Sequence, residues 1–518
     1  MHKSNRFLSN ASSPLALAAL GVAVAVALAA PGMAHASAFQ LHENSTQGLG
    51  RAYAGSTTAG GDVSVVENNP AAMSDLDGTF VQADITAVNF SAKFSGSSHD
   101  VLGNSIGGGN GGDAGTTLPV PALAISTKVS DRVNLGVAFD VPFGFQTEYD
   151  NNWMGRYDAV KTVLKSYDST LSASFKINDE WSIGASAIAE RTNANLSNAI
   201  NFNAVGLGIQ QGIAKQAQAQ AAAAVAAAAA QLQAAVAANQ MTAQQAAAML
   251  AAAQQQATAA ATAAATAGAA QVAAALPPGS QGYAEVKGNN WAWGWQLGAY
   301  WKPTANDRVG LNYRSRITHD IDGTANFNTA GAPGYGLLLA NAQLASSIPP
   351  FTHTTGTARL TNPAVATLSY WHKEDKFGIG ADVSWTQWSL MRSLTVNYAN
   401  PSQPDTVLPF NWRNTYYVAV GGEYYANDKL TLRAGVSVDQ APMNATNRDP
   451  RVPDGARRML AFGIGYKASE HFEINASYAH IFVSHAGVDG ATSATADVLT
   501  GTYDDYGNLL SLSAQYKF

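Results

Sequence analysis

The chain contains no cysteine, and only 13% of its 518 residues are charged. Because disulfides stabilise many exported proteins, the absence of cysteine excludes a disulfide scaffold. The formal net charge of −6 is not the basic excess that nucleic-acid binding requires, so no nucleic-acid partner is expected. After the N-terminal segment, no run of about 18 apolar residues is free of Gln, Gly or charge, and no membrane-spanning helix is expected.

Residues 1–36 have the features of a secretory signal peptide. A basic start precedes an uncharged apolar stretch from Leu15 to Ala30, and Ala34-His35-Ala36 has the small-x-small pattern of a cleavage site. The break at Pro31-Gly32 argues against the alternative, a transmembrane anchor. We therefore expect cleavage after Ala36 and export of the mature chain.

Several segments alternate between apolar and polar side chains, which indicates strands with one apolar face. The clearest are 291–301, 460–466, 472–479 and the C-terminal segment 510–518, which ends on Phe518. An exported chain that crosses a bilayer without helices must do so as a closed barrel. The pattern therefore predicts an all-β fold, a transmembrane antiparallel β-barrel in the bacterial outer membrane, with Phe518 presented to the barrel assembly machinery.

Short polar turns alternate with long connections rich in Gly, Pro and Asn. Short turns are expected at 130–131, 178–180, 306–307, 373–375, 427–428 and 469–470. Long loops are expected at about 95–117, 150–160, 205–285, 328–350, 399–409, 441–455 and 486–502. This alternation is typical of short periplasmic turns and long outer loops, and it gives about fourteen strands in a barrel domain at 78–518.

Residues 37–77 precede the first strand and do not alternate. Their position on the periplasmic side predicts a hatch that plugs the lumen. The alternative is a disordered periplasmic tail.

The long loop at 205–285 contains an Ala/Gln tract from Lys215 to about Leu276. Ala and Gln favour helices, and the break at 239–242 with Thr242 as an N-cap predicts two helices in an outer loop. We interpret the tract as a low-complexity expansion. The alternatives are a part in ligand capture or in subunit contact.

The start of the mature chain, from Phe39-Gln40-Leu41-His42 to Arg51-Ala52-Tyr53-Ala54-Gly55, is followed by Asn69-Pro70-Ala71. This ordered pattern resembles the FadL/TodX (OMPP1) family of outer-membrane transporters for long-chain fatty acids and hydrocarbons. Further similar segments are Trp291-Ala292-Trp293-Gly294-Trp295, Leu311–Ser315, Trp385–Trp388, Asn411–Thr415 and Asn447–Arg457. The resemblance implies a fourteen-stranded barrel plugged by an N-terminal hatch that carries the Asn-Pro-Ala motif.

The resemblance also implies a passive route for a hydrophobic small molecule past lipopolysaccharide and into the outer-membrane lipid. Such a ligand would adsorb between outer loops, enter an apolar lumen pocket and leave sideways through a kink in the third strand. Phe39 and Leu41 would lie at the pocket, with Asn69, Pro70 and Ala71 in the hatch. The alternative for Phe39 is a solvated, frayed N-terminus.

The segment Pro142-Phe143-Gly144 supplies a physical basis for the kink. Pro142 lacks a backbone donor, and Gly144 has no side chain to pack, so strand pairing should break here. We expect a lateral opening at these residues. The alternative is a bulge near the rim of the barrel.

Arg392, Arg413 and Arg457 are candidate carboxylate partners in the lumen, since an unpaired charge facing lipid is costly. The alternative for each is an ion pair with an acidic side chain. Where fatty-acid-carrying relatives are expected to have basic residues, this chain has Asn198 and Leu408. That difference leaves an uncharged hydrocarbon open as the ligand.

No arrangement of Ser, His and Asp forms a nucleophile, base and orienting group, and His319, Asp320 and His353 lack metal-ligand spacing. We therefore expect a monomeric transporter, not an enzyme, with no catalytic residues, metal or cofactor. The competing interpretations are a surface-display or adhesion barrel without transport, a lipid hydrolase and a general porin.

Overall fold

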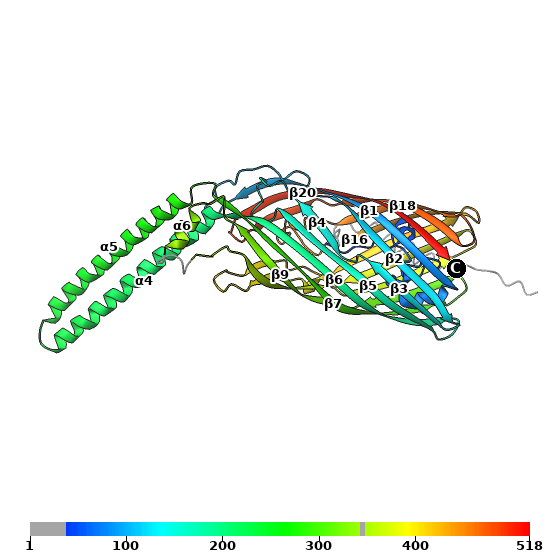
Figure 1. The fold of residues 1–518 in the computed structure, drawn as a ribbon, viewed down its shortest axis with the longest axis horizontal. Helices are drawn as coiled ribbons and strands as arrows, with labels where there is room; N and C mark the ends of the chain where they lie inside the picture. Colours follow the sequence, from blue (N-terminus) through cyan, green and yellow to red (C-terminus); the bar gives the residue numbers. More distant parts are fainter. Residues whose placement is uncertain (1–37, 342–347) are drawn as a thin grey trace, which may run out of the picture.

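The computed structural model describes residues 38–341 and 348–518, so the predicted signal peptide lies outside the described residues. In this part of the chain, twenty strand segments form one antiparallel sheet. The sheet closes because the first segment, β1 (Thr79–His99), pairs with the last, β20 (Val498–Lys517), along nearly its whole length. Six strands are each interrupted once, so the segments make up a closed barrel of fourteen strands, and the predicted fold is confirmed (Figure 1).

The uninterrupted strands, besides β1 and β20, are β2 (Thr117–Ser130), β5 (Lys161–Lys176), β6 (Trp181–Asn201), β7 (Gln281–Trp301), β16 (Leu430–Asp439) and β17 (Arg457–Lys467). The interrupted strands are β3 (Val133–Asp140) with β4 (Gly144–Glu148), β8 (Asp307–Arg314) with β9 (Ile317–Asn328), β10 (Thr354–Asn362) with β11 (Val365–Lys373), β12 (Phe377–Thr386) with β13 (Ser393–Tyr398), β14 (Thr406–Pro409) with β15 (Thr415–Tyr425), and β18 (Phe472–Val483) with β19 (Ala486–Thr492).

The apolar face of the barrel points outward. Trp291, Trp293 and Trp295 on β7 are exposed, with Trp293 exposed by 77%. Most inward residues of β5 are polar and buried, among them Ser166, Ser172 and Ser174. A soluble sheet protein has the opposite arrangement, whereas a barrel surrounded by lipid needs this one.

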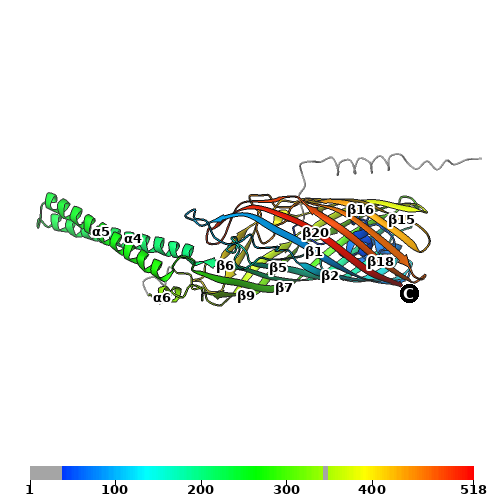
Figure 2. The same cartoon turned by 90° about the horizontal axis from the view of Figure 1, so that it is seen from above.

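The short turns and the long loops lie at opposite ends of the barrel. The C-terminus lies at the end with the short turns, and the longest loop projects as a helical hairpin from the other end (Figures 1 and 2). The hairpin consists of α4 (Phe202–Ala237) and α5 (Ala243–Ala275). The Thr242 hydroxyl caps α5 by accepting from Gln245 N, which confirms the predicted pair of helices.

Among the described residues, the hairpin packs against the rest of the chain only at its base. Phe202 packs against Tyr335 of the short helix α6 (Tyr335–Ala340), with ring centroids 4.5 Å apart, and against Phe351 at 5.5 Å. Beyond the base, almost all side chains of α4 and α5 are exposed or half-buried. By length and composition α4 would be long enough to cross a membrane, but it is half of this projecting hairpin.

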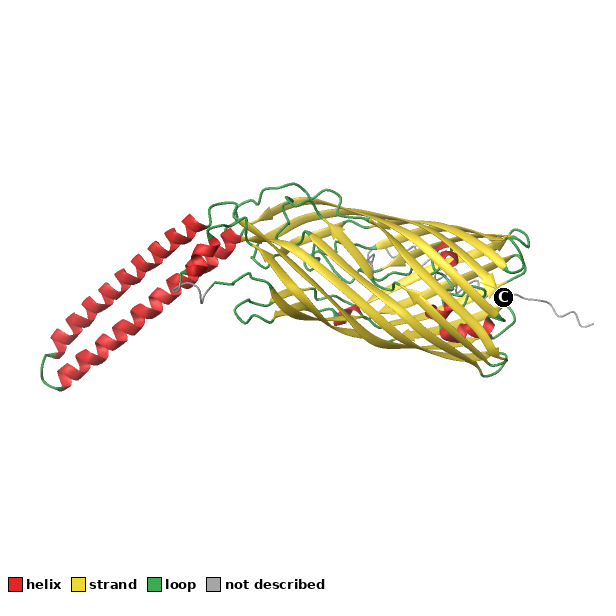
Figure 3. Cartoon of the chain, viewed as in Figure 1, coloured by secondary structure: helices red, strands yellow, loops and turns green. Residues whose placement is uncertain are grey.

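The segment before β1 folds into a plug-like region inside the barrel, near the end with the short turns (Figure 3). It contains α2 (Thr46–Gly50), α3 (Val65–Asn68) and the 3-10 helix η1 (Pro70–Asp75). Helix α2 contacts β16, β17, β18 and β20, whereas η1 contacts β5, β6 and β7. The region therefore bridges opposite parts of the wall, and we call it the hatch.

Candidate functional site

An apolar cavity lies in the lumen between the hatch and the outer loops. The space not filled by protein atoms there is about 850 Å³, including the part that is open to solvent. Its lining comes from inward positions on many strands, and it includes Phe39, Phe145, Leu164, Leu196, Ile321, Leu360, Met391, Leu394, Val396, Leu408, Phe410, Trp412 and Val452. Because these side chains are apolar and surround one space, the cavity favours a hydrophobic ligand.

Phe39 lies at the hatch side of this apolar cavity and is only 4% exposed. Its ring is 4.7 Å from that of Trp388, 5.8 Å from Trp412 and 6.0 Å from Phe143, measured between centroids. The chain before it is held because Arg457 Nη2 donates to Ala38 O at 2.9 Å. Phe39 is thus a packed aromatic side chain between the cavity and the kink.

An outer groove continues the apolar cavity toward the loops. Ala199, Ile200, Val205, Ala284, Phe327 and Phe351 contribute to its lining. Leu196, Val286, Val396 and Leu408 line both spaces. The two are therefore adjoining parts of one apolar path from the loops at the base of the hairpin to the lumen.

The third strand of the barrel is broken between β3 and β4. Strand β5 pairs with both halves, up to Asp140↔Asp168 and again from Gly144↔Lys165. On the other side, β2 pairs with β3 only as far as Leu123↔Phe139. In the described chain, β4 has no backbone pairing to β2. The break at Pro142-Phe143-Gly144 expected from the sequence therefore exists, and it interrupts the wall on one side.

The N-terminal segment of the hatch pairs with the break. Leu41 N donates to Pro142 O, and Gly144 N donates to Phe39 O, each at 2.9 Å. The Leu41 side chain packs against Gly144, because a Cβ atom added to this glycine would lie 2.9 Å from Leu41 Cδ1. Residues 39–41 thus form hydrogen bonds with Pro142 and Gly144 at the kink and cover Gly144. We call these residues the N-terminal strap.

A second, polar cavity lies between the hatch and the break. Pro142, Phe143, Leu41 and His42 line it, together with the acidic side chains Glu67, Asp140 and Asp382. Burial and the positive charge of Arg457 lower the pKa of His42 to about 4, whereas burial raises the pKa of Glu43. His42 is therefore neutral at pH 7.

Asn69, Pro70 and Ala71 dock the hatch onto the wall and do not line the apolar cavity. Asn69 Nδ2 donates to Thr57 O at 3.1 Å and to Ala299 O of β7 at 3.2 Å. Asn69 Oδ1 accepts from Ala71 N at 3.2 Å. Asn69 approaches β7 so closely that a Cβ on Gly298 would lie 2.0 Å from its Oδ1. The motif is an anchor of the hatch.

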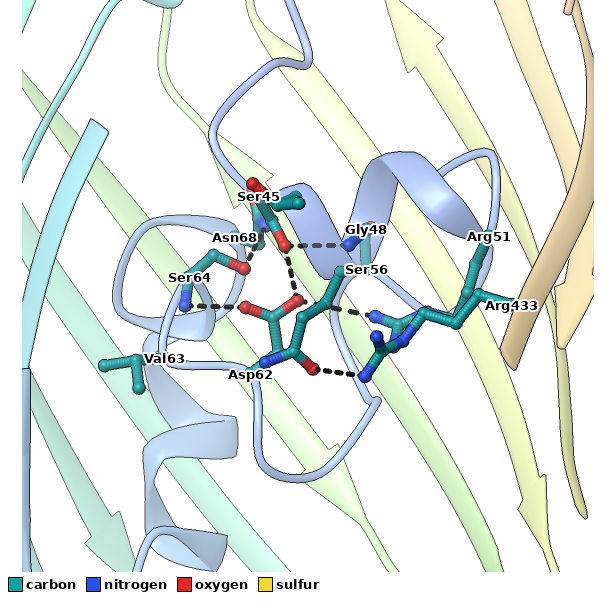
Figure 4. Close-up of polar contacts among 12 residues, drawn as sticks. Ser45, Gly48, Arg51, Ser56, Asp62, Val63, Ser64, Asn68 and Arg433 are labelled. Atoms are coloured by element: carbon teal, nitrogen blue, oxygen red, sulfur yellow. Dashed lines mark hydrogen bonds and ion pairs between the residues drawn. The ribbon is translucent and has the colours of Figure 1, made fainter. Parts of the chain in front are cut away.

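A polar network holds the rest of the hatch together. Asp62 accepts from Ser45 Oγ at 2.6 Å and from Ser64 N at 3.1 Å (Figure 4). Arg51 forms two ion pairs, one with Asp62 (Nη2 to Oδ2, 3.4 Å) and one with Glu423 of the wall. The hatch is thus fixed by buried charges on one side and by Asn69 on the other.

The three predicted arginines do not line the apolar cavity. Arg392 and Arg413 are exposed, and Arg457 binds Ala38 O and, through Nε, Asp454 Oδ1 at 3.1 Å. The buried arginine that does line the cavity is Arg451, whose Nη1 lies 3.0 Å from Asp449 Oδ2. Asn198 lines the outer groove. Arg451 lies within the segment 447–457 that supports the family resemblance, but nothing in its spacing separates it from its basic neighbours.

Comparison with known proteins agrees with this architecture. The profile of the family described as outer membrane protein transport protein (OMPP1/FadL/TodX) matches residues 26–518. The long-chain fatty acid transport protein of Escherichia coli K12 is 27% identical, over 89% of this chain and 91% of that protein. Outer membrane protein P1 of Haemophilus influenzae is 26% identical, over 96% of this chain and 98% of that protein.

Two solved structures extend the comparison. A Pseudomonas aeruginosa FadL homologue has a TM-score of 0.75 and 27% identity, and the match covers 93% of this chain and 100% of that one. The Pseudomonas putida toluene transporter TodX has a TM-score of 0.57 and 17% identity, with coverage of 92% and 99%. The second likeness is one of fold.

Proposed function

Because the chain belongs to the OMPP1/FadL/TodX family of outer-membrane transport proteins, we propose that it is a passive channel for long-chain fatty acids or similar hydrophobic compounds. The observation that carries the proposal is the apolar cavity in the lumen, which adjoins an outer groove and is lined by aliphatic and aromatic side chains. A water-filled porin would not have such a lining, and a display barrel would not need one.

Capture begins at the outer groove and proceeds to the cavity. Burial contributes about 0.8 kcal/mol for each methylene removed from water, so the outer groove and the apolar cavity each bind a longer hydrocarbon chain more tightly. Shared lining residues such as Leu196 and Leu408 allow a ligand to stay in apolar contact as it moves inward. No energy source is needed, because the ligand ends in a bilayer that is at least as apolar.

Release occurs sideways, through the break between β3 and β4. The missing pairing between β2 and β4 supports this exit. Phe39 and the N-terminal strap lie between the cavity and the break, so a shift of the strap opens the path. The strap is suited to this role because its hydrogen bonds to the kink are few.

The side chains at the cavity wall bear on whether the ligand carries a carboxylate or is uncharged. The carboxylate of a fatty acid could bind Arg451 at the cavity wall, but the guanidinium of Arg451 is already paired with Asp449. Its pairing, together with Leu408 in the lining, favours an uncharged hydrocarbon as the second candidate.

Uptake of radiolabelled oleate and of a radiolabelled alkylbenzene, measured in cells that lack their own transporters, tests the proposal and separates the two ligands. Uptake of oleate that falls when Arg451 is replaced by Gln assigns the fatty acid. Uptake of the alkylbenzene alone assigns the hydrocarbon. No uptake of either, with the barrel present at the surface, would contradict the proposal and favour surface display.

A further inference from the structure

Three carboxylates from separate elements meet beside the break in the third strand. Glu67 lies on α3 of the hatch, Asp140 is the last residue of β3, and Asp168 is its register partner on β5. One oxygen from each lies within 4.8 Å of the others. Two acidic residues directly opposite each other across a strand pair destabilise a sheet, so this arrangement needs a compensating partner.

The three side chains are buried and incompletely bonded. Glu67 is 7% exposed, Asp140 5% and Asp168 0%. Within the described chain, Glu67 Oε2, Asp140 Oδ1 and both Asp168 side-chain oxygens have no hydrogen-bond partner. Asp168 is in an ion pair with Arg314 Nη2 at 2.6 Å, without the alignment of a hydrogen bond. Buried acceptors in a native structure are normally satisfied, so these oxygens require an explanation.

Protein cations do not balance the cluster. Arg314 pairs with Asp168, with Glu67 at 3.1 Å and with a fourth carboxylate, Glu190, at 2.9 Å. His319 Nε2 lies 2.7 Å from Glu190 Oε1. Four carboxylates thus share one guanidinium and one imidazole, which leaves two negative charges unmatched even when the imidazole is protonated.

We propose that Glu67, Asp140 and Asp168 bind a divalent cation that joins the hatch to the barrel wall at the broken strand. A divalent ion supplies the positive charge that the cluster lacks, and it is coordinated by the carboxylate oxygens that have no hydrogen-bond partner. The site goes beyond the proposed transport function, since binding of the ion does not depend on which ligand the channel carries.

The donor set points to calcium or magnesium. All three ligands are carboxylate oxygens, which hard cations prefer, and the cluster contains no thiolate. The polar cavity reaches Glu67 and Asp140 and gives access to water, which completes the coordination of such ions. Asn312 Oδ1 lines the same cavity and has no hydrogen-bond partner among the described residues, so it is a further candidate oxygen ligand.

The position of the site links two parts of the channel. Glu67 is two residues before Asn69, and Asp140 is two residues before Pro142. A bound ion therefore ties the hatch anchor to the residue from which the break starts.

Calorimetric titration of the purified full chain in detergent, after treatment with a chelator, tests the site directly. We expect one saturable site for Ca²⁺ or Mg²⁺ per chain, lost in Asp140→Asn and in Asp168→Asn. The matched control is Asp320→Asn, because Asp320 is an exposed acid on β9 that pairs with Arg359 at 2.7 Å. This variant should bind the ion as the original chain does.

Thermal unfolding provides a second readout that a merely structural role would not give. Without metal, Asp140→Asn should raise the unfolding temperature, because one repelling charge is removed. With saturating Ca²⁺ or Mg²⁺, the original chain should gain heat stability and the variant should not.

Absence of saturable binding in the original chain, or equal binding by Asp140→Asn, would overturn the proposal. So would a heat stability that rises on acidification and ignores both ions, because protons would then neutralise the cluster. Should Asp140→Asn fail to fold, Glu67→Gln changes the ligand on the hatch and leaves the strands as they are.

Discussion

Two strands of the barrel are interrupted at a proline, and only one of the two interruptions leaves a half strand that pairs on one side alone. At Pro363, between β10 and β11, the flanking pairs Asn362↔Ile317 and Val365↔Arg314 keep the same register. Strand β10 also pairs with β13, and β11 with β12. At Pro142, the strand that β4 pairs with in the described chain is β5 alone. A proline interrupts the strand in both places, but of these two breaks only the one at Pro142 leaves the following half strand paired on one side.

The second difference is what lies against each break. The N-terminal strap hydrogen-bonds to Pro142 O and to Gly144 N, in place of a neighbouring strand. At Pro363, ordinary strand pairs flank the break. The break at Pro142 is thus covered by the N-terminal strap, whereas the break at Pro363 is flanked by strands of the barrel itself.

The largest effect is expected from Phe39→Ala. Removing this ring deletes contacts with Phe143, Trp388 and Trp412, and truncation of a buried Phe costs about 3–5 kcal/mol. The strap should then leave the kink, and a bound fluorescent fatty acid should be released at least about 10-fold faster, since each 1.4 kcal/mol is a factor of ten. Stopped-flow fluorescence measures this rate.

The conservative variant Phe39→Leu keeps an apolar side chain and should have a smaller effect. Equal release from the original chain and from Phe39→Ala would mean that the strap does not close the break.

A smaller effect is expected from Arg457→Gln. The variant loses the bond from Arg457 to Ala38 O and leaves Asp454, which is fully buried, without this partner. Loss of a charged hydrogen bond costs about 1.5–3 kcal/mol, so the strap should become more accessible to protease. Limited proteolysis with N-terminal sequencing measures this.

Arg458→Gln is the matched control, because Arg458 is the next residue and its side chain is exposed. Similar cleavage of the two variants would argue against a tether at Ala38.

A still smaller effect is expected from acidification, through His42 in the hatch. Its pKa is about 4 in the folded chain and about 6.5 in an unfolded one, so the unfolded chain binds the proton more readily. The stability contribution is present above pH 6.5 and is lost as the pH falls toward 4, by about 1 kcal/mol between pH 7 and pH 5.5. Protease cleavage of the hatch should increase over this range, and less in His42→Gln. An identical pH profile of the two chains would exclude His42 as the cause.

The smallest effect is expected from deleting residues 215–267, which keeps Val272 and Leu276 of the base cluster. Among the described residues the hairpin packs only at its base, around Phe202 and Tyr335, and the energy of closing a surface loop depends weakly on its length. The heat-modifiable barrel form on gels should remain, with uptake within about twofold of the original. Loss of uptake with an intact barrel would contradict this expectation and would show that uptake depends on the hairpin.

Much of this architecture follows from local patterns in the sequence. The outward tryptophans of β7, the alternating loop lengths and Thr242 at the start of α5 are all signals within one strand, turn or helix. Pro142 and Gly144 mark the break in the same way. These features were predictable because the residues that determine each one are neighbours in the chain.

The lining of the site was not predictable for the opposite reason. The cavity is made by single inward side chains from many strands, such as Leu164, Leu360 and Phe410, and their meeting depends on closure of the barrel. Arg451 has no local pattern that distinguishes it from Arg448 or Arg457. Pro363 looks like Pro142 in sequence, and only the pairing of its neighbours tells the two breaks apart.

The most direct measurement compares the two breaks in one uptake assay. Pro142-Phe143-Gly144 is replaced by Val-Thr-Val, which restores donors and side chains for pairing with β2, and Pro363→Val is the matched control. Both chains are first shown to form the heat-modifiable barrel at the cell surface. We predict that uptake of the labelled ligand falls to background in the Val-Thr-Val chain and stays unchanged in Pro363→Val. Unchanged uptake in the Val-Thr-Val chain would contradict release through the broken third strand.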